Sequence, residues 1–131
     1  MGTTNTITFV LLLAQKRPLS FISGAQIDLR EKLSRGNRSE FHHLMPKAFL
    51  ASSGQTSPPA NCLANFAFIS RADNRELGGV APSKYRSKMP ADTTEILRSA
   101  ICRDVLFTDD YPAFVRERAN DLRDFANHLC L

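Results

Sequence analysis

Two short segments with a strand-like pattern, residues 39–44 and 63–70, lie on either side of a loop with the sequence ASSGQTSPPA. This loop, residues 51–60, is small, polar and rich in proline, which is typical of a connection between elements. Pro46 ends the first segment, because proline cannot donate a hydrogen bond to a strand ladder. The pattern therefore predicts a hairpin with a long loop. In its second strand, alternation places Ala64, Phe66 and Phe68 on one face and Asn65, Ala67 and Ile69 on the other.

The segments before the hairpin favour helices. The apolar run 7–15 is compatible with a buried helix or a strand, and its periodicity does not separate the two. Its leucines are good helix formers and Pro18 follows closely, so we expect a helix. A second, shorter helix capped by Asp28 is also expected, with its apolar face and its end formed by Leu29, Leu33 and Gly36.

The segments after the hairpin also favour helices. A helical turn is expected from residue 71, interrupted at Gly78–Gly79, and a short helix from Pro82 to Met89. Two longer helices follow, each with an apolar stripe at three- and four-residue intervals. The first, capped by Asp92 or Thr93, has a stripe formed by Ile96, Leu97, Ala100 and Ile101. The second has a stripe formed by Tyr111, Phe114, Val115, Ala119, Leu122, Phe125, Ala126 and Leu129.

The order helix, strand, strand, helix, helix, helix predicts a small α+β fold. A length of 131 residues fits a single domain. Within it we expect an N-terminal helical part at 1–38, a core at 39–90 that holds the hairpin, and C-terminal helices at 91–131.

Composition indicates which class of partner and which cellular compartment to expect. A net charge of +4 favours a polyanionic partner, and a hydrophobic fraction of 43% is too high for a disordered chain. The three cysteines are far apart and form no CxxC pair, which argues against a disulfide framework or a thiolate zinc site. The apolar run 7–14 is too short to span a bilayer and no positive charge precedes it. We therefore expect a cytoplasmic protein with no membrane partner.

The adjacent pair His42-His43 is the first candidate for chemistry, with Glu40 and Lys47 close by in the sequence. Imidazole serves both metal binding and proton transfer near neutral pH. Successive residues of a strand point to opposite faces, so one imidazole can face a metal while the other faces a substrate.

Two asparagines downstream complete the candidate set. Asn65 lies inside an apolar strand pattern, where an unpaired amide costs about 1–3 kcal/mol, so a hydrogen-bond partner is expected. Asn74 is compatible with a helix cap or with a metal ligand. Phosphodiester hydrolysis needs a base for water, charge stabilisation at phosphorus and help for the leaving oxygen. A histidine and one divalent metal can supply these if His42, His43 and Asn74 converge.

The motif His42-His43-Leu44-Met45-Pro46, followed by Asn65 and then Asn74, resembles the HNH class of ββα-metal (His-Me finger) nucleases. Asn74 follows Asn65 by nine residues, the spacing of the asparagine-type members. The gap between His43 and Asn65 is longer than in compact members, and the loop 51–60 accounts for the excess. The flanking segments are similar to the branch that lies C-terminal to ParB-like nucleotide-hydrolysing domains in modification-dependent restriction and phage-defence proteins.

The resemblance implies a metal-dependent endonuclease that hydrolyses DNA, with a ββα-metal core flanked by N-terminal and C-terminal helices. It implies His43 as the general base, and His42 and Asn74 as ligands of Mg²⁺ or Mn²⁺. Asn65 matches the central asparagine, which ties the hairpin loop to the backbone and orients the base. Phosphate contacts are expected from the basic residues around the motif, namely Lys47, Arg71, Arg75 and Lys84.

Other interpretations stay open from the sequence. The chain can be a non-catalytic nucleic-acid-binding remnant of such a nuclease. It can also be a docking module whose C-terminal helix binds a separate ParB-like nucleotide-hydrolysing chain. The histidine pair taken alone also fits a surface or packing role, and the basic residues fit a solvated rim.

Overall fold

The expected hairpin is present and antiparallel. The computed structural model describes residues 4–30 and 41–130. Strand β1 (Phe41–His43) pairs with β2 (Phe66–Phe68), in a register that places His42 opposite Ala67 and His43 opposite Phe66. Strand β2 is shorter than the sequence pattern predicts, and β1 ends at His43, one residue before its expected end. Residues 39 and 40 of the expected first strand lie outside the described residues. The fold is α+β, as expected.

Helices account for most of the remaining regular structure. The α-helices of the described residues are α1 (Thr4–Gln15), α3 (Lys47–Ser52), α4 (Arg71–Leu77), α5 (Pro82–Tyr85), α6 (Thr94–Ser99) and α7 (Tyr111–Leu129). Short 3₁₀ helices cover Leu63–Asn65, Arg86–Lys88 and Asp104–Thr108. Within the part of the chain that the structure describes, no helix is long and apolar enough to cross a membrane.

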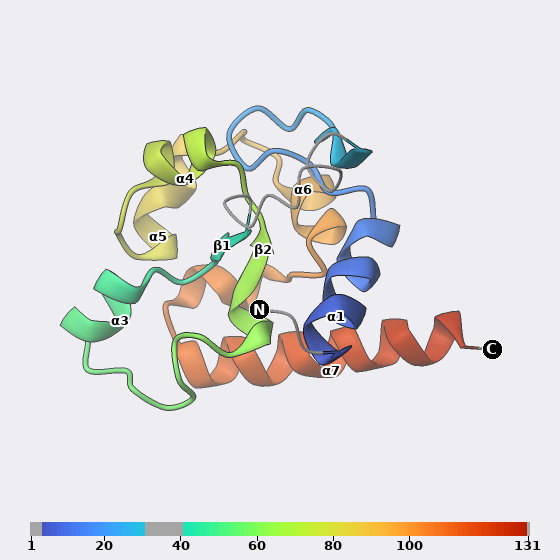
Figure 1. Cartoon of the computed structure of the whole chain (residues 1–131). Coiled ribbons are helices and arrows are strands. Elements are labelled where there is room, and N and C mark those ends of the chain that lie inside the picture. The colour runs from blue at the N-terminus through green and yellow to red at the C-terminus, as the bar shows by residue number, and fades with distance from the viewer. Residues whose placement is uncertain (1–3, 31–40, 131) are drawn as a thin grey trace.

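The hairpin lies in the middle of the molecule, with α1 on one side of it and α3, α4 and α5 on the other (Figure 1). The long helix α7 runs past the hairpin and past α1. Two groups of apolar side chains meet at the hairpin. Phe9 and Leu13 of α1 pack with Phe68, while Ala67 and Ile69 join the larger group formed with the helices on the other side. Both faces of β2 are therefore covered.

One detail of the expected alternation is wrong. Ala64 was expected on the face of Phe66 and Phe68, but it packs in the larger group with Ala67. The reason is local: residues 63–65 form a 3₁₀ turn, which breaks the two-residue period before β2 begins at Phe66. The same turn buries Asn65 completely, at 0% exposure.

Helix α3 lies between the two strands and was not predicted. Pro46 was expected only to end a strand. In the structure it also stands at the N-cap of α3, with an extended ψ of 143°. Proline removes no needed donor at the start of a helix, so Pro46 can end one element and begin the next. The loop that follows starts after Ser52 rather than at residue 51.

Helices form at the predicted places after the hairpin, but α6 ends at Ser99, so Ala100 and Ile101 of its expected stripe lie beyond the helix. Ser70 caps α4 by accepting a hydrogen bond from the Asp73 N–H, so Asn74 is not the cap and lies within the helix. Gly78 ends α4 with a φ of 74°, a conformation that favours glycine. The helix expected from Asp28 is described only as far as residue 30, and the remainder lies outside the described residues.

The last helix, α7, spans the whole of the predicted apolar stripe but buries a different face. Tyr111, Phe114 and Val115 are buried as expected, whereas Ala119 and Leu129 are exposed. Arg118 is buried instead, with 1% of its surface exposed. Helical periodicity cannot find this position, because it assigns arginine to the solvent face.

The Arg118 guanidinium joins α7 to the hairpin. One terminal nitrogen donates to the carbonyl oxygens of Ala64 and Phe66, at 2.7 and 2.6 Å, and the other donates to the Ala100 carbonyl at 3.0 Å. Its Nε has no hydrogen-bond partner among the described residues. Burial lowers the pKa of Arg118, but arginine stays charged at any working pH. Arg118 thus donates to three carbonyls at once, and the Ala100 carbonyl also accepts a weaker hydrogen bond from the Cys102 thiol at 3.5 Å.

Replacing Arg118 tests this role. We expect Arg118→Met to lower the free energy of unfolding by about 3 kcal/mol, because the carbonyls of Ala64, Phe66 and Ala100 lose the guanidinium donor and Met restores none of these hydrogen bonds. Arg116→Met on the exposed face of the same helix serves as the control and should change stability by less than about 0.5 kcal/mol. Urea unfolding followed by circular dichroism measures both. Equal stability of the two variants would contradict the role given to Arg118.

Candidate functional site

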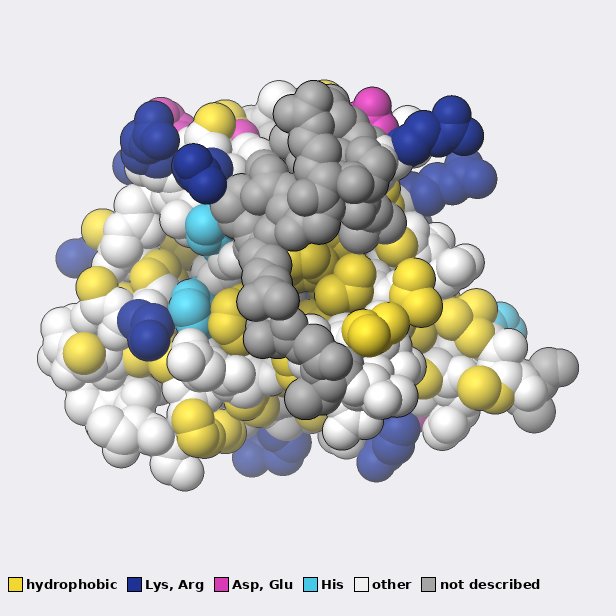
Figure 2. Space-filling model, viewed as in Figure 1, with side chains coloured by type: hydrophobic (Ala, Val, Ile, Leu, Met, Phe, Trp, Pro, Cys, Tyr) yellow, Lys and Arg dark blue, Asp and Glu magenta, His cyan; other side chains and the backbone are white. Residues whose placement is uncertain are grey.

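The histidine pair occupies the last two positions of β1, where the strand ends before Pro46. Both side chains are half-buried. The His43 ring packs on Phe66, its cross-strand partner, with ring centroids 4.5 Å apart and a tilt of 39°. Figure 2 shows histidine side chains at the surface over the region of β1, with Lys and Arg side chains around them.

A surface hollow of about 300 Å³ lies at this end of the hairpin. The described residues that line it come from the end of β1, the start of α3, the middle of α4 and the glycine turn after α4: His42, His43, Pro46, Lys47, Ala48, Asn74, Gly78 and Gly79. The three side chains that sequence analysis selected for chemistry therefore border one hollow, although Asn74 is distant from the histidines in the sequence.

Adjacent strand residues were expected to face opposite ways, with a metal on one side and substrate on the other. In the structure both His42 and His43 border the same hollow. The hollow lies where β1 ends and α3 begins, so side chains from both faces of the strand can reach it.

Asn65 holds the backbone on which this hollow is built. Its Oδ1 accepts from the Met45 N–H at 2.9 Å, and its Nδ2 donates to the carbonyls of Met45 and Ala60 at 3.0 and 2.9 Å. Its main-chain carbonyl also accepts from the Leu44 N–H at 2.7 Å. The buried amide thus has the partners that its sequence position required, and it ties the segment after β1 to the end of the 53–62 loop.

Asn61 contacts the candidate base and was not selected from the sequence. The His43 Nε2 lies 2.9 Å from the Asn61 Oδ1. Partial burial lowers the pKa of His43, the Asn61 hydrogen bond raises it, and electrostatic interactions with Lys47 and His42 lower it again, with a net downward shift. The neutral imidazole is therefore favoured near neutral pH. Asn61 sits in an irregular loop, where no sequence pattern marks a residue as a partner of His43.

Asn74 reaches the hollow from α4. The helix is held by the Ser70 cap and by a hydrogen bond from the Ser20 hydroxyl to the Asp73 carboxylate at 2.5 Å. Within residues 4–30 and 41–130, the Asn74 side chain makes no hydrogen bond. Its amide oxygen is available to a ligand.

The glycine turn closes one side of the hollow. A Cβ placed on Gly79 would lie 3.4 Å from the Cβ of Ala48, so α3 and this turn approach closely. Gly78 has a φ of 74° and nothing within 4 Å of its Cβ position, so backbone conformation rather than space favours glycine there.

The expected phosphate contacts are distributed unevenly. Lys47 lines the hollow, at the first position of α3. Arg71 and Arg75 on α4 and Lys84 on α5 are exposed but do not line it. Other basic residues close in the sequence have structural partners, since Arg86 donates to two carbonyls and Lys88 donates to the Glu76 carbonyl.

The donor set at the hollow fits a divalent metal in chemical type. His42 offers an imidazole nitrogen and Asn74 an amide oxygen, and no Asp or Glu is among the described residues that line the hollow. Nowhere in the described part of the chain do three or more His, Cys, Asp or Glu residues gather in a way that could hold a metal. Two neutral ligands would leave most coordination positions to water and to phosphate oxygens, as is common for Mg²⁺.

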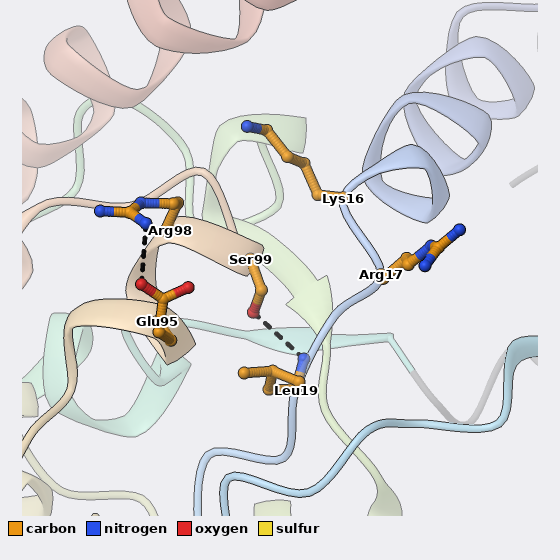
Figure 3. A pocket seen from close by; sticks show the side chains of 6 residues that line it. All are labelled: Lys16, Arg17, Leu19, Glu95, Arg98 and Ser99. Carbon is orange, nitrogen blue, oxygen red and sulfur yellow. Dashed lines mark hydrogen bonds and ion pairs between the residues drawn. The ribbon is translucent and has the colours of Figure 1, made fainter.

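A second hollow, of about 200 Å³, lies between the end of α1 and α6 and is lined by cations (Figure 3). It has a different character from the histidine hollow. Arg98 is paired with Glu95 at 2.7 Å, and Ser99 accepts a hydrogen bond from the Leu19 N–H. Lys16 and Arg17 point in different directions in Figure 3, and Lys16 stacks over Phe125. These cations do not converge on a ligand.

Comparison with protein-family models, with curated proteins and with solved structures finds no match to this chain.

Asn65 should be essential for the fold around the hollow. We expect Asn65→Ala to lower the free energy of unfolding by about 3 kcal/mol, because it leaves one N–H and two carbonyls of the buried backbone without partners. Asn120→Ala on the exposed face of α7 is the matched control and should be neutral or slightly stabilising. Thermal and urea unfolding measure the difference, and equal stability of the two variants would contradict the role given to Asn65.

Proposed function

We propose that this protein is a metal-dependent endonuclease that hydrolyses DNA phosphodiester bonds at the His42–His43–Asn74 hollow. The observation that carries the proposal is the convergence of these three side chains, together with Lys47, on one surface hollow. This arrangement supports the similarity to HNH nucleases noted from the sequence, in the branch associated with restriction and phage defence. We also propose that the protein is cytoplasmic.

His43 is the general base. Its pKa is lowered by partial burial, so the imidazole is neutral and can accept a proton. It removes a proton from a water molecule as the oxygen of that water attacks phosphorus. The bond between phosphorus and the leaving oxygen breaks, and the leaving oxygen takes a proton from solvent water.

His42 and Asn74 would hold the metal, Mg²⁺ or Mn²⁺, at the hollow that His43 also borders. When bound, a divalent ion supplies positive charge to the phosphate and to the leaving oxygen. Lys47 adds a fixed positive charge at the same hollow, which favours the approach of a phosphate.

DNA as the substrate is supported by the charge of the chain. The net charge is +4, and the exposed cations Arg71, Arg75 and Lys84 lie on α4 and α5, the elements that follow the hairpin. Such contacts position a backbone without reading its sequence. A separate ParB-like nucleotide-hydrolysing chain, expected from the resemblance, is the proposed partner that supplies target choice.

The first test is plasmid nicking. We expect the purified chain to nick supercoiled DNA with Mg²⁺ or Mn²⁺ and to stop when a chelator is added. His43→Ala should reduce the rate by about 10²- to 10⁴-fold, the usual contribution of a general base. His128→Ala, which changes an exposed histidine in the last turn of α7, should keep the parental rate.

The results separate the alternatives. If the parent chain is inert but binds DNA with an affinity that falls steeply as salt is added, it is a non-catalytic binding module. If it neither cuts nor binds DNA, the partner-docking interpretation is favoured. A His43→Ala variant that cuts at the parental rate would show that His43 is not the base.

The metal ligands can be tested by titration. We expect His42→Ala and Asn74→Ala each to raise the metal concentration for half-maximal nicking by at least about tenfold, because each removes one of two protein ligands. His128→Ala and Asn127→Ala, both on the exposed surface of α7, match them in chemistry and should leave the curve unchanged. Nicking rate against Mg²⁺ and Mn²⁺ concentration is the measurement, and an unshifted curve for both site variants would remove the proposed metal position.

A further inference from the structure

Asn61 makes a contact that neither the sequence pattern nor the proposed roles account for. Its side-chain oxygen lies 2.9 Å from the Nε2 of His43. The contact crosses from the irregular loop before β2 to the end of β1, and it involves Nε2 of the His43 ring. An exposed asparagine keeps such a geometry only if both ends of the contact are held in place.

The backbone on both sides of Asn61 is held. The Ala60 carbonyl accepts from the buried Asn65 side chain at 2.9 Å. The Cys62 N–H donates to the Pro59 carbonyl at 3.1 Å, and that carbonyl also accepts from the Tyr111 hydroxyl at 2.8 Å. Asn61 therefore projects from a segment anchored to the core and to α7, although its own side chain is exposed.

His43 is held as well. Its ring packs against Phe66, and its backbone is paired with the same residue in the hairpin. The imidazole thus has one face against an aromatic ring and its Nε2 against a carbonyl-type oxygen. Little rotational freedom remains for the ring.

A neutral imidazole carries one proton, so one nitrogen donates and the other accepts. An oxygen facing Nε2 favours the proton at Nε2. The lone pair is then at Nδ1. General-base catalysis needs a lone pair at the nitrogen that faces the attacking water, and a tautomer with the proton at the wrong nitrogen is inactive.

We propose that Asn61 is a positioning residue for His43: its side-chain oxygen accepts from Nε2–H, holds the neutral ring in that tautomer and leaves Nδ1 as the atom that takes the proton from water. The proposal rests on the proposed nuclease function for its catalytic part. The tautomer itself is a property of the protein alone.

The tautomer is tested first, without DNA or metal. Histidine labelled with ¹⁵N is studied at about pH 8, where an ordinary imidazole is neutral, and the His43 signals are assigned by their loss in His43→Ala. We expect a protonated Nε2 and an unprotonated Nδ1 in the parent chain. Asn61→Leu, which keeps a similar volume but has no acceptor, should give a mixture of tautomers. Asn61→Asp, which keeps the acceptor, should retain the parental spectrum.

The nicking assay then links the tautomer to activity. Asn61→Leu should lower kcat by about 10- to 100-fold, as is typical when the partner that orients a histidine is removed. Asn61→Asp should restore kcat while raising KM, because its negative charge opposes the DNA phosphates. Asn127→Leu, an exposed asparagine on α7, is the control and should match the parent.

The outcomes separate the role of Asn61 from the proposed nuclease activity. A protonated Nδ1 in the parent chain, or an Asn61→Leu spectrum identical to the parental one, overturns the positioning role whatever the activity. Parental kcat in Asn61→Leu overturns it too. A parent chain that cuts no DNA rejects the proposed function, while the spectra still decide whether Asn61 sets the tautomer.

Discussion

The buried guanidinium of Arg118 supports the rest of the structure. It donates to the carbonyls of Ala64 and Phe66, the two residues that flank Asn65, and so joins the long helix α7 to the turn that enters β2. No carboxylate is recorded among its hydrogen-bond partners, so its charge is met by backbone dipoles of the described residues and by the nearby ring of Phe9. A charge buried in this way is costly unless its hydrogen bonds are made.

Arg118 also supports the hollow indirectly, through the hydrogen bonds of Asn65. The turn held by Arg118 buries Asn65, whose side chain fixes the backbone at Met45 and at Ala60. The first of these contacts sets the bend after His43, and the second sets the loop that carries Asn61. The candidate base and its neighbour are exposed to solvent in part, yet their positions follow from groups in the core. This division suits the proposed nuclease site, which would have to reach DNA while keeping its geometry.

Much of the coarse fold follows from the sequence. The hairpin, α4, α6 and α7 were predicted because each has a local signal: alternation around Phe66, Gly78 after a helical turn, and apolar stripes at helical spacing. The errors lie where one residue serves two elements or where packing overrides pattern. Pro46 ends a strand and begins α3, and the turn at residues 63–65 moves Ala64 to the other face. Arg118 occupies a core position, whereas a sequence pattern assigns a charged residue to the surface.

For the candidate site, the sequence determined the residue types and their order: His42, His43, Asn65 and Asn74. It also required a partner for the Asn65 amide, since a buried amide without one is costly. Only the tertiary structure brought Asn74 to the histidine hollow, left Arg71, Arg75 and Lys84 outside its lining, and placed Asn61 against His43. The physical reason is the separation along the chain of the residues that interact. Strand and helix patterns depend on neighbours in the chain, whereas these contacts depend on how the hairpin, the loop and α4 pack together.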